Sequence, residues 1–318
     1  MRHFWLIFVL FGCTAPDKIK FNQEKPMRIE FVRELTLPHL LQTGRQKYIS
    51  AASGLVKAHG NFYAVADDEH HLVRIPEDGT LPCQSYSIFS GTLPLEAQKR
   101  KKKKPDLEAI TFLEPNSSLQ NGALLLIPSG SEKNRTRGAL FPFVSPNQLA
   151  AEPREIDFSP LYSEIAKKIG PINIEGAVVT KSGIKLFNRG NGAGKNAVID
   201  VGYTLSPLTF SLLHATFVDL GKEQNFPIAF TDASITGNGE IYFLAVAEAT
   251  PSSYEDGRLL GAFIGKISTD NQIISLTREN FQMKPEGIYI DENGSKTRFY
   301  FVTDPDDSNI ASQLLVGI

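Results

Sequence analysis

The sequence predicts an all-β protein with a β-propeller fold, and the repeat pattern is the first observation behind this prediction. Five short segments look like copies of one element, and their first positions are 55, 67, 58 and 53 residues apart: Ser53-Gly54-Leu55, Glu108-Ala109-Ile110, Glu175-Gly176-Ala177, Ala233-Ser234-Ile235 and Glu286-Gly287-Ile288. Each copy opens an apolar run and is followed by a second strand-like run with a polar end: NFYAVADD, ALLLIPSGS, GIKLFNRG, EIYFLAVAE and RFYFVTDP. A period of this length built of strands is typical of a propeller.

The two ends of the chain supply the second observation. The last repeat is one strand short, because QLLVGI ends the chain at Ile318, while an unused strand-like run occupies residues 27–37. Pairing these two runs would complete the fifth blade and leave no open sheet edge in the ring. We therefore predict five blades closed by the N- and C-terminal strands. A sixth, degenerate blade within residues 140–172 is the alternative.

Each blade needs four antiparallel strands packed on both faces, so its strands should be apolar throughout. The expected strands follow in order: GLVKA, NFYAVAD, HLVRIP and QSYSIF; AITFL, ALLLIP, ALFPFVS and REIDFS; GAVVT, GIKLFN, AVIDVGY and HATFVDL; SIT, EIYFLAVAE, GAFIGKIS and IISLTRE; GIYID, RFYFVTD and QLLVGI. One helix is predicted after Ser159-Pro160, a cap followed by a proline at the first helical position. Leu161, Ile165 and Ile169 share one face of it, and Gly170-Pro171 ends it.

Composition excludes several classes of protein. The chain of 318 residues fits one closed all-β array, and its net charge of −2 provides no global field for nucleic acid. The only tryptophan is Trp5 and no Trp-Asp dipeptide occurs, which argues against WD40-type blades. We expect a monomer that binds a small molecule and no nucleic acid.

The first residues have the pattern of a targeting segment. Arg2 and His3 precede an apolar run, Phe4 to Phe11, that is too short to span a bilayer stably. Leu10-Phe11-Gly12-Cys13 then resembles the lipobox of bacterial lipoproteins, which implies a lipidated Cys13. We predict a leader at 1–13, a tether at 14–26 and the propeller at 27–318. This places the protein in the cell envelope, on the outer membrane facing the periplasm or the exterior. An ordinary secretory signal and a buried strand are the alternatives.

A ring of acids is the strongest chemical signal in the chain. Glu108, Glu175 and Glu286 hold equivalent repeat positions, so the fold would aim all three at one end of the central channel. Further acids lie beside this ring or end the next strand: Asp106, Asp232, Asp67, Asp68, Glu248, Asp304 and Asp306. Converging carboxylates repel one another and need a cation, a proton or a basic partner. A Ca²⁺ ion, acid–base catalysis, and purely structural hydrogen bonding are the three interpretations.

Arg189 is the best candidate for a cation near these acids. It ends the strand that follows Glu175, so it should reach the channel mouth. Its guanidinium could pair with Glu175 or hold a substrate, with Asp67 and Asp232 as further substrate contacts. The alternative is a structural counter-ion.

The segments Pro105-Asp106-Leu107-Glu108-Ala109-Ile110, Asn173-Ile174-Glu175-Gly176-Ala177 and Pro285-Glu286-Gly287-Ile288 resemble the "esterase-like activity of phytase" propellers. These are similar to the calcium-dependent gluconolactonase and regucalcin group. The KPD-x-EA and NRGN segments also resemble a family of bacterial secreted propellers of unknown function. The resemblance implies a divalent ion, Ca²⁺, held by a channel Glu with Asn188 or Asp304 assisting, and implies hydrolysis of a small substrate.

Three other features carry weaker signals. The basic run Lys99 to Lys104 is expected to be a solvated loop, with anion recruitment as the alternative. Cys83 is expected to be a buried residue without catalytic function. Gly190-Asn-Gly-Ala-Gly-Lys195 departs from a P-loop because Asn196 replaces the required Ser or Thr, and a hairpin loop is predicted.

Together, these observations predict a lipid-anchored propeller with a hydrolase-like site at the channel mouth. In this hypothesis Glu175 and Arg189 are catalytic, and Glu108, Glu175, Glu286, Asn188 and Asp304 are the candidate metal ligands. The substrate would be a small ester, lactone or phosphate. The alternative is a non-catalytic propeller that recognises a glycan, a peptide or a partner protein.

Overall fold

The computed structural model describes residues 25–77, 79–190, 194–250, 257–292 and 297–318. The predicted lipidation site, Cys13, and the middle of the glycine-rich loop, residues 191–193, lie outside these ranges. Within the part of the chain that is described, no helix is both long and apolar enough to cross a membrane.

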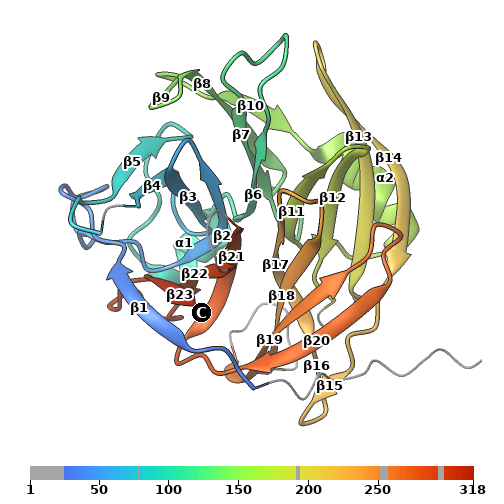
Figure 1. Cartoon of the computed structure of the whole chain (residues 1–318). Helices are drawn as coiled ribbons and strands as arrows, with labels where there is room; N and C mark the ends of the chain where they lie inside the picture. The colour runs from blue at the N-terminus through green and yellow to red at the C-terminus, as the bar shows by residue number, and fades with distance from the viewer. Residues whose placement is uncertain (1–24, 78, 191–193, 251–256, 293–296) are drawn as a thin grey trace, which may run out of the picture.

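Five antiparallel sheets stand side by side in a ring, each a blade of the propeller (Figure 1). The first three blades, written from the innermost strand outward, are β2 (Ala52–Ala58), β3 (Asn61–Ala66), β4 (His71–Pro76) and β5 (Gln84–Ser87); β6 (Leu107–Leu113), β7 (Ala123–Pro128), β8 (Arg137–Ser145) and β10 (Arg154–Asp157); and β11 (Ile174–Thr180), β12 (Gly183–Asn188), β13 (Ala197–Leu205) and β14 (Leu208–Phe217).

The other two blades are β17 (Ala229–Ile235), β18 (Ile241–Ala249), β19 (Arg258–Ile267) and β20 (Ile273–Glu279); and β21 (Lys284–Asp291), β22 (Arg298–Asp304), β23 (Gln313–Gly317) and β1 (Ile29–Glu34). Short strands make up the rest: β9 (Gln148–Leu149) pairs with β8, and β15 (Lys222–Glu223) pairs with β16 (Phe226–Pro227). The all-β propeller prediction is confirmed.

The ring closes as predicted, through the two ends of the described chain. β1 pairs with β23, with Ile29 opposite Gly317 and Glu34 opposite Gln313. In Figure 1 the blue strand β1 lies beside the red strand β23. The six-blade alternative is wrong, because residues 140–172 contribute the outer strands of the second blade and a helix, with Arg154 opposite Leu140.

A β-bulge marks the same place in every innermost strand. The pairing with the second strand skips one residue in each blade, and the skipped residues are Gly54, Glu108, Glu175, Thr231 and Glu286. Successive skipped positions are 54, 67, 56 and 55 residues apart. The true repeat equivalents in the first and fourth blades are therefore Gly54 and Thr231, and the predicted alignment on Ser53 and Ala233 is wrong by one and two residues.

These bulges explain how the acids reach the channel. A bulge bends its strand and redirects the extra side chain, which would otherwise follow the alternation of the sheet. Three of the five bulged residues are glutamates, so three blades direct a carboxyl group into the same end of the channel.

The helix predicted after Ser159 is α2 (Ser159–Ile169), with Leu161, Ile165 and Ile169 buried. It packs against β14 on the outside of the third blade, where the ring of Phe158 stacks on Phe210 at 5.1 Å. A second helix, α1 (Ala97–Lys103), replaces the loop expected for the basic run. That prediction is wrong because Arg100, on the inner face of α1, is buried among the site carboxylates and holds the segment in a helical turn.

Apolar side chains fill the spaces between blades. One of the interblade clusters joins β17 and β18 to β12, where the rings of Phe187, Phe230 and Phe243 contact edge to face at 5.1–5.2 Å. Cys83 is fully buried in another cluster, and burial raises the pKa of its thiol to about 11, so it is protonated at neutral pH.

Candidate functional site

A cavity of about 300 Å³ opens at the end of the channel where the innermost strands begin. It receives side chains from all five blades. Among the residues predicted from sequence, those that line it are Asp67, Asp68, Asp106, Glu108, Glu175, Arg189, Glu248, Glu286, Asp304 and Asp306. The structure therefore brings together most of the predicted site at one end of the ring. Its charged groups divide into two clusters.

The first, called the balanced cluster, joins blades 1 and 2. Its four acids face four bases: Asp67, Asp68, Glu69 and Asp106 with Arg45, Arg100, Lys104 and Arg135. The Nζ of Lys104 lies 2.7 Å from Asp106 Oδ1 and also contacts Asp67. Arg135 Nη1 lies 2.9 Å from Asp106 Oδ2. The acids come from the end of β3 and the start of β6.

The electrostatics of Asp106 follow from this pairing. Burial alone would raise its pKa, but Lys104 and Arg135 more than offset burial and hold the pKa below the ordinary value. Ser129 Oγ also donates a hydrogen bond to this carboxylate. Asp68 differs, because burial and the neighbouring Asp67 raise its pKa to about 6. The cluster as a whole is a set of paired charges that ties blade 1 to blade 2.

The second, called the proton-rich cluster, joins blades 3, 4 and 5. Five acids face two bases: Glu175, Glu248, Glu286, Asp304 and Asp306 with Arg189 and Lys284. Arg189 follows β12, and its Nη1 lies 3.6 Å from Glu175 Oε2 and 3.9 Å from Glu286 Oε1.

Lys284, the first residue of β21, is the other base of the proton-rich cluster. Its Nζ lies 3.2 Å from Glu286 Oε1 and 2.8 Å from Asp306 Oδ1. The second nitrogen of the Arg189 guanidinium group contacts Glu248. Two cations are therefore shared among more carboxyl groups than they can neutralise.

Protonation of carboxyl groups compensates for the excess of acids over bases in the proton-rich cluster. Burial raises the pKa of Glu175 to about 8, opposed by Arg189, and raises that of Glu286 to about 7, opposed by Lys284 and Arg189. Burial also holds the pKa of Asp304 well above its usual range. At neutral pH, part of this cluster consists of neutral carboxylic acids, which can donate a proton to a bound molecule.

Glu108 lies between the two clusters. Its carboxyl group has neither a hydrogen bond nor an ion pair within the described residues. Burial raises its pKa well above the usual range, and the nearby Asp106 and Glu175 add to this shift. Glu108 therefore joins Glu175, Glu286 and Asp304 as a carboxyl group at the cavity with a raised pKa.

Two predicted site residues lie outside the cavity lining. The Oδ2 of Asp232 accepts hydrogen bonds from the backbone N–H groups of Leu55, at 3.2 Å, and Ile288, at 2.8 Å. Asp232 thereby links its own blade to blades 1 and 5 across the channel. The Asn188 side chain accepts from Asn173 N at 2.7 Å and donates to the Lys195 carbonyl at 3.1 Å. The structure uses both side chains to hold the backbone.

The sequence interpretation missed most of the cations. Lys284 and Lys104 both stand directly before a proline at the start of an innermost strand, Pro285 and Pro105, and this shared Lys-Pro pair was the available signal. Arg45 and Arg135 come from connecting segments outside the repeat, and no sequence signal pointed to either.

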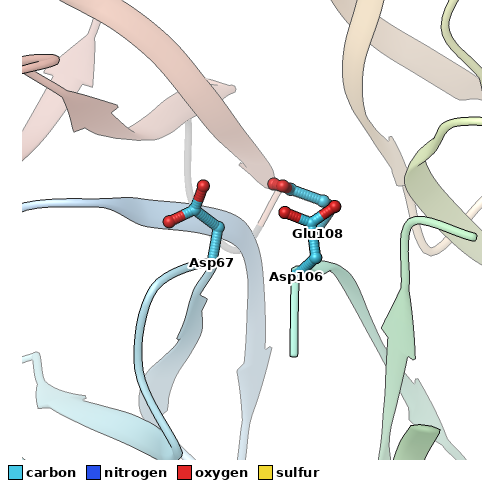
Figure 2. A group of neighbouring side chains, drawn as sticks. All are labelled: Asp67, Asp106 and Glu108. Atoms are coloured by element: carbon cyan, nitrogen blue, oxygen red, sulfur yellow. The ribbon is translucent and has the colours of Figure 1, made fainter. Parts of the chain in front are cut away.

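Calcium was predicted for this end of the channel, and one carboxylate group has suitable spacing. Figure 2 shows Asp67 on one blade facing Asp106 and Glu108 on the next, and their oxygens lie within 4.8 Å of one another. However, the ammonium of Lys104 already binds both Asp67 and Asp106. With Lys104 in place this donor set does not fit a divalent ion. Calcium stays a prediction, and no step below depends on it.

Comparison with known proteins identifies the family. The chain belongs to a family of unknown function (DUF6929). The family model matches residues 48–317. A search of curated proteins found no match.

Solved structures with a similar fold are distant in sequence. The major allergen Mala s 1 of Malassezia sympodialis is 12% identical, with a TM-score of 0.50 over 85% of this chain and 94% of that one. A luciferin-regenerating enzyme is 10% identical, with a TM-score of 0.42 over 92% and 95% of the two chains. A streptogramin B lyase is 10% identical, with a TM-score of 0.39 over 92% and 98%. At these identities the similarity extends to the fold alone.

Proposed function

We propose that the cavity is the active site of a hydrolase that cleaves a small ester or lactone, with Glu175 as its central catalytic residue. One observation carries the proposal: Glu175 lines a cavity at the channel mouth, is buried with a pKa of about 8, and lies 3.6 Å from Arg189. A carboxylic acid that keeps its proton at neutral pH beside a cation is a typical arrangement for proton transfer.

Glu286 and Glu175 would share the proton transfers. Glu286 is the more ionised of the two, because it contacts both Lys284 and Arg189, and it would accept a proton from the attacking water. The oxygen of that water forms the new bond to the carbonyl carbon. Glu175 would donate its proton to the leaving oxygen as the ester bond breaks. Arg189 would stabilise the negative charge that develops on the carbonyl oxygen.

The reacting group is expected to be uncharged. The reacting group would bind beside six carboxyl groups, those of Glu108 and of the proton-rich cluster. Only two cations of the proton-rich cluster, Arg189 and Lys284, lie beside the same place. A phosphate dianion there would face several acidic oxygens, and each ionised one would repel it. An ester or lactone carbonyl meets no such penalty. Phosphate hydrolysis, which the sequence left open, is therefore disfavoured.

The test is a panel of small esters and lactones with the Glu175→Gln variant. Because Glu175 is largely protonated at neutral pH, an uncharged amide of the same shape should preserve the fold. We expect turnover to fall by about two to four orders of magnitude. Asp232→Ala is the matched control, since it alters a buried channel acid outside the cavity and should keep its activity per folded molecule. Turnover that survives Glu175→Gln would exclude Glu175 as the catalytic residue. A wild-type protein inert on the whole panel would leave the non-catalytic binding propeller.

A further inference from the structure

We propose that the outer face of α1 is a second part of the substrate site, which binds an anionic group of the substrate just outside the cavity. The anionic group would be a carboxylate or a phosphate on the same molecule whose ester or lactone bond reacts at Glu175. The claim that the bound molecule is a substrate rests on the proposed function. The claim that α1 binds an anion rests on other residues.

The helix is held firmly at the cavity rim by its inner face. The Arg100 side chain donates to the Asp68 carbonyl at 2.6 Å and to the Pro94 carbonyl at 3.0 Å. Lys104, one helical turn later, binds Asp67 and Asp106. Two of the six consecutive basic residues thus point inward to the balanced cluster.

The other four basic residues form the outer face, called the lysine face: Lys99, Lys101, Lys102 and Lys103, all exposed. Lys99 pairs with the exposed Glu96, an interaction worth little. Lys102 and Lys103 have no ion pair within the described residues. Lys101 also lines the cavity mouth, which joins this face to the site. Four like charges within two helical turns repel one another, so their concentration here needs a reason in a chain of net charge −2.

The backbone of the lysine face is fixed relative to the site. Arg135 Nη2 donates to the Lys101 carbonyl at 3.0 Å, and Asn134 Nδ2 donates to the Lys102 carbonyl at 3.2 Å. Since Arg135 also binds Asp106, one side chain links the helix to the cavity wall. The lysines are therefore carried by a rigid element at a set distance from the cavity, as substrate recognition requires.

The charge at the cavity mouth is asymmetric. Asp306 and Asp307, which follow β22 in blade 5, also line the opening, whereas α1 precedes blade 2. A molecule with one anionic end would therefore enter with that end on the lysine face and its uncharged end toward Glu175.

The test compares two esters with one leaving group, 4-nitrophenyl acetate and mono-4-nitrophenyl glutarate, which adds a carboxylate. The variant is Lys101→Gln/Lys102→Gln/Lys103→Gln, and the control is Lys167→Gln/Lys168→Gln on α2. We expect the wild type and the control to favour the glutarate ester in kcat/KM by about tenfold at low salt. The triple variant should lose this preference, because its kcat/KM should fall more for the glutarate ester than for the acetate ester. An equal preference in all three proteins would overturn the proposal.

A binding measurement separates this proposal from the proposed function. Pyrophosphate is titrated calorimetrically into the same three proteins, without any need for turnover. Weaker binding by about tenfold in the triple variant supports the lysine face even if no ester is hydrolysed, which would count against the hydrolase alone. Equal affinities in all three proteins overturn the lysine face. A triple variant that loses only its binding to vesicles of an anionic phospholipid would assign this face to a membrane instead.

Discussion

The balanced cluster and the proton-rich cluster lie in one cavity and are built from the same residue types, yet their charges are compensated differently. In the balanced cluster, Asp106 binds two cations and has a lowered pKa. In the proton-rich cluster, two cations serve five carboxyl groups, and burial raises the pKa of Glu175 to about 8. The number of cations in each cluster decides which acids stabilise the fold and which are available for proton transfer.

Removing a cation from the balanced cluster should have the largest effect on stability. Lys104→Met leaves the buried Asp106 and its neighbour Asp67 without their shared ammonium. We expect the free energy of unfolding to fall by about 3–5 kcal/mol, measured by denaturant unfolding at pH 7. Lys102→Met, on the same helix but exposed, should cost less than about 0.5 kcal/mol. Equal effects of the two substitutions would mean that the pairing of charges in this cluster has no structural role.

Asp232→Ala should have the next largest effect. It leaves the buried N–H groups of Leu55 and Ile288 without an acceptor, at a cost of about 2–4 kcal/mol in unfolding free energy. Asp232→Asn, which retains one acceptor oxygen, should cost clearly less. If Asp232→Ala is as stable as the wild type, the hydrogen bonds of Asp232 across the channel contribute nothing to the free energy of unfolding.

Calcium gives a sharper test of the role of Lys104. In Lys104→Met no ammonium competes for Asp67 or for Asp106 Oδ1, so these two residues and Glu108 could bind a divalent ion, while Arg135 still holds Asp106 Oδ2. Saturating Ca²⁺, at about 100 times its Kd, should then restore about 2.7 kcal/mol, read as a rise in Tm over an EDTA control. The wild type should respond much less. A wild-type rise as large as that of the variant would confirm the calcium prediction and show that Lys104 does not occupy the site.

Glu175 and Glu286 of the proton-rich cluster and Asp106 of the balanced cluster should respond to opposite ends of the pH scale. Glu175 and Glu286 have pKa values raised to about 8 and 7 in the folded state, above their ordinary value of 4.5. Between pH 4.5 and pH 8 the folded protein therefore binds more protons than the unfolded chain. Their contribution to stability therefore declines as pH rises from about 4.5 to 8. Asp106, with its lowered pKa, contributes at neutral pH and loses that contribution in acid, below about pH 4.

We expect the free energy of unfolding to be about 4 kcal/mol lower at pH 9 than at pH 6, from denaturant titrations at the two pH values. Glu175→Gln, which cannot ionise, should flatten this slope. A wild-type protein that is more stable at pH 9 would contradict protonation of the proton-rich cluster.

Glu175→Gln should have the smallest effect on stability at pH 7. It replaces a largely neutral acid with a neutral amide of the same shape, so the free energy of unfolding should change by less than about 0.5 kcal/mol. Glu248→Gln is the informative comparison, since Glu248 contacts both Arg189 and Lys284. A Glu175 variant that unfolds as readily as the Glu248 variant would make Glu175 structural.

The fold was predictable because its signal is repeated. Five similar segments and a missing strand at one end were enough for the blade number and the closure by β1 and β23. The register was harder, because a bulge changes which residue faces the channel without changing the apolar pattern. The true fourth copy is Thr231-Asp232-Ala233, and an alignment by composition alone missed it.

The site was predictable only in part. The glutamates of three blades were found because they recur at one repeat position, at Glu108, Glu175 and Glu286. The cations of the balanced cluster come from α1 and from connecting segments, whose positions depend on tertiary contacts such as that between Arg135 and Asp106. The split into two clusters depends on these cations, so neither the raised pKa values nor the place of Lys104 could be derived from spacing.

The most direct test is the protonation state of Glu175 itself. Protein labelled with ¹³C at the glutamate side-chain carboxyl carbon would be titrated by NMR from pH 5 to pH 9, alongside Glu175→Gln to assign the resonance. We predict a carboxyl resonance with a midpoint of about 8 that is absent from the variant. A Glu175 resonance that is already fully ionised at pH 6 would contradict the proposed acid and the division of the cavity into two clusters.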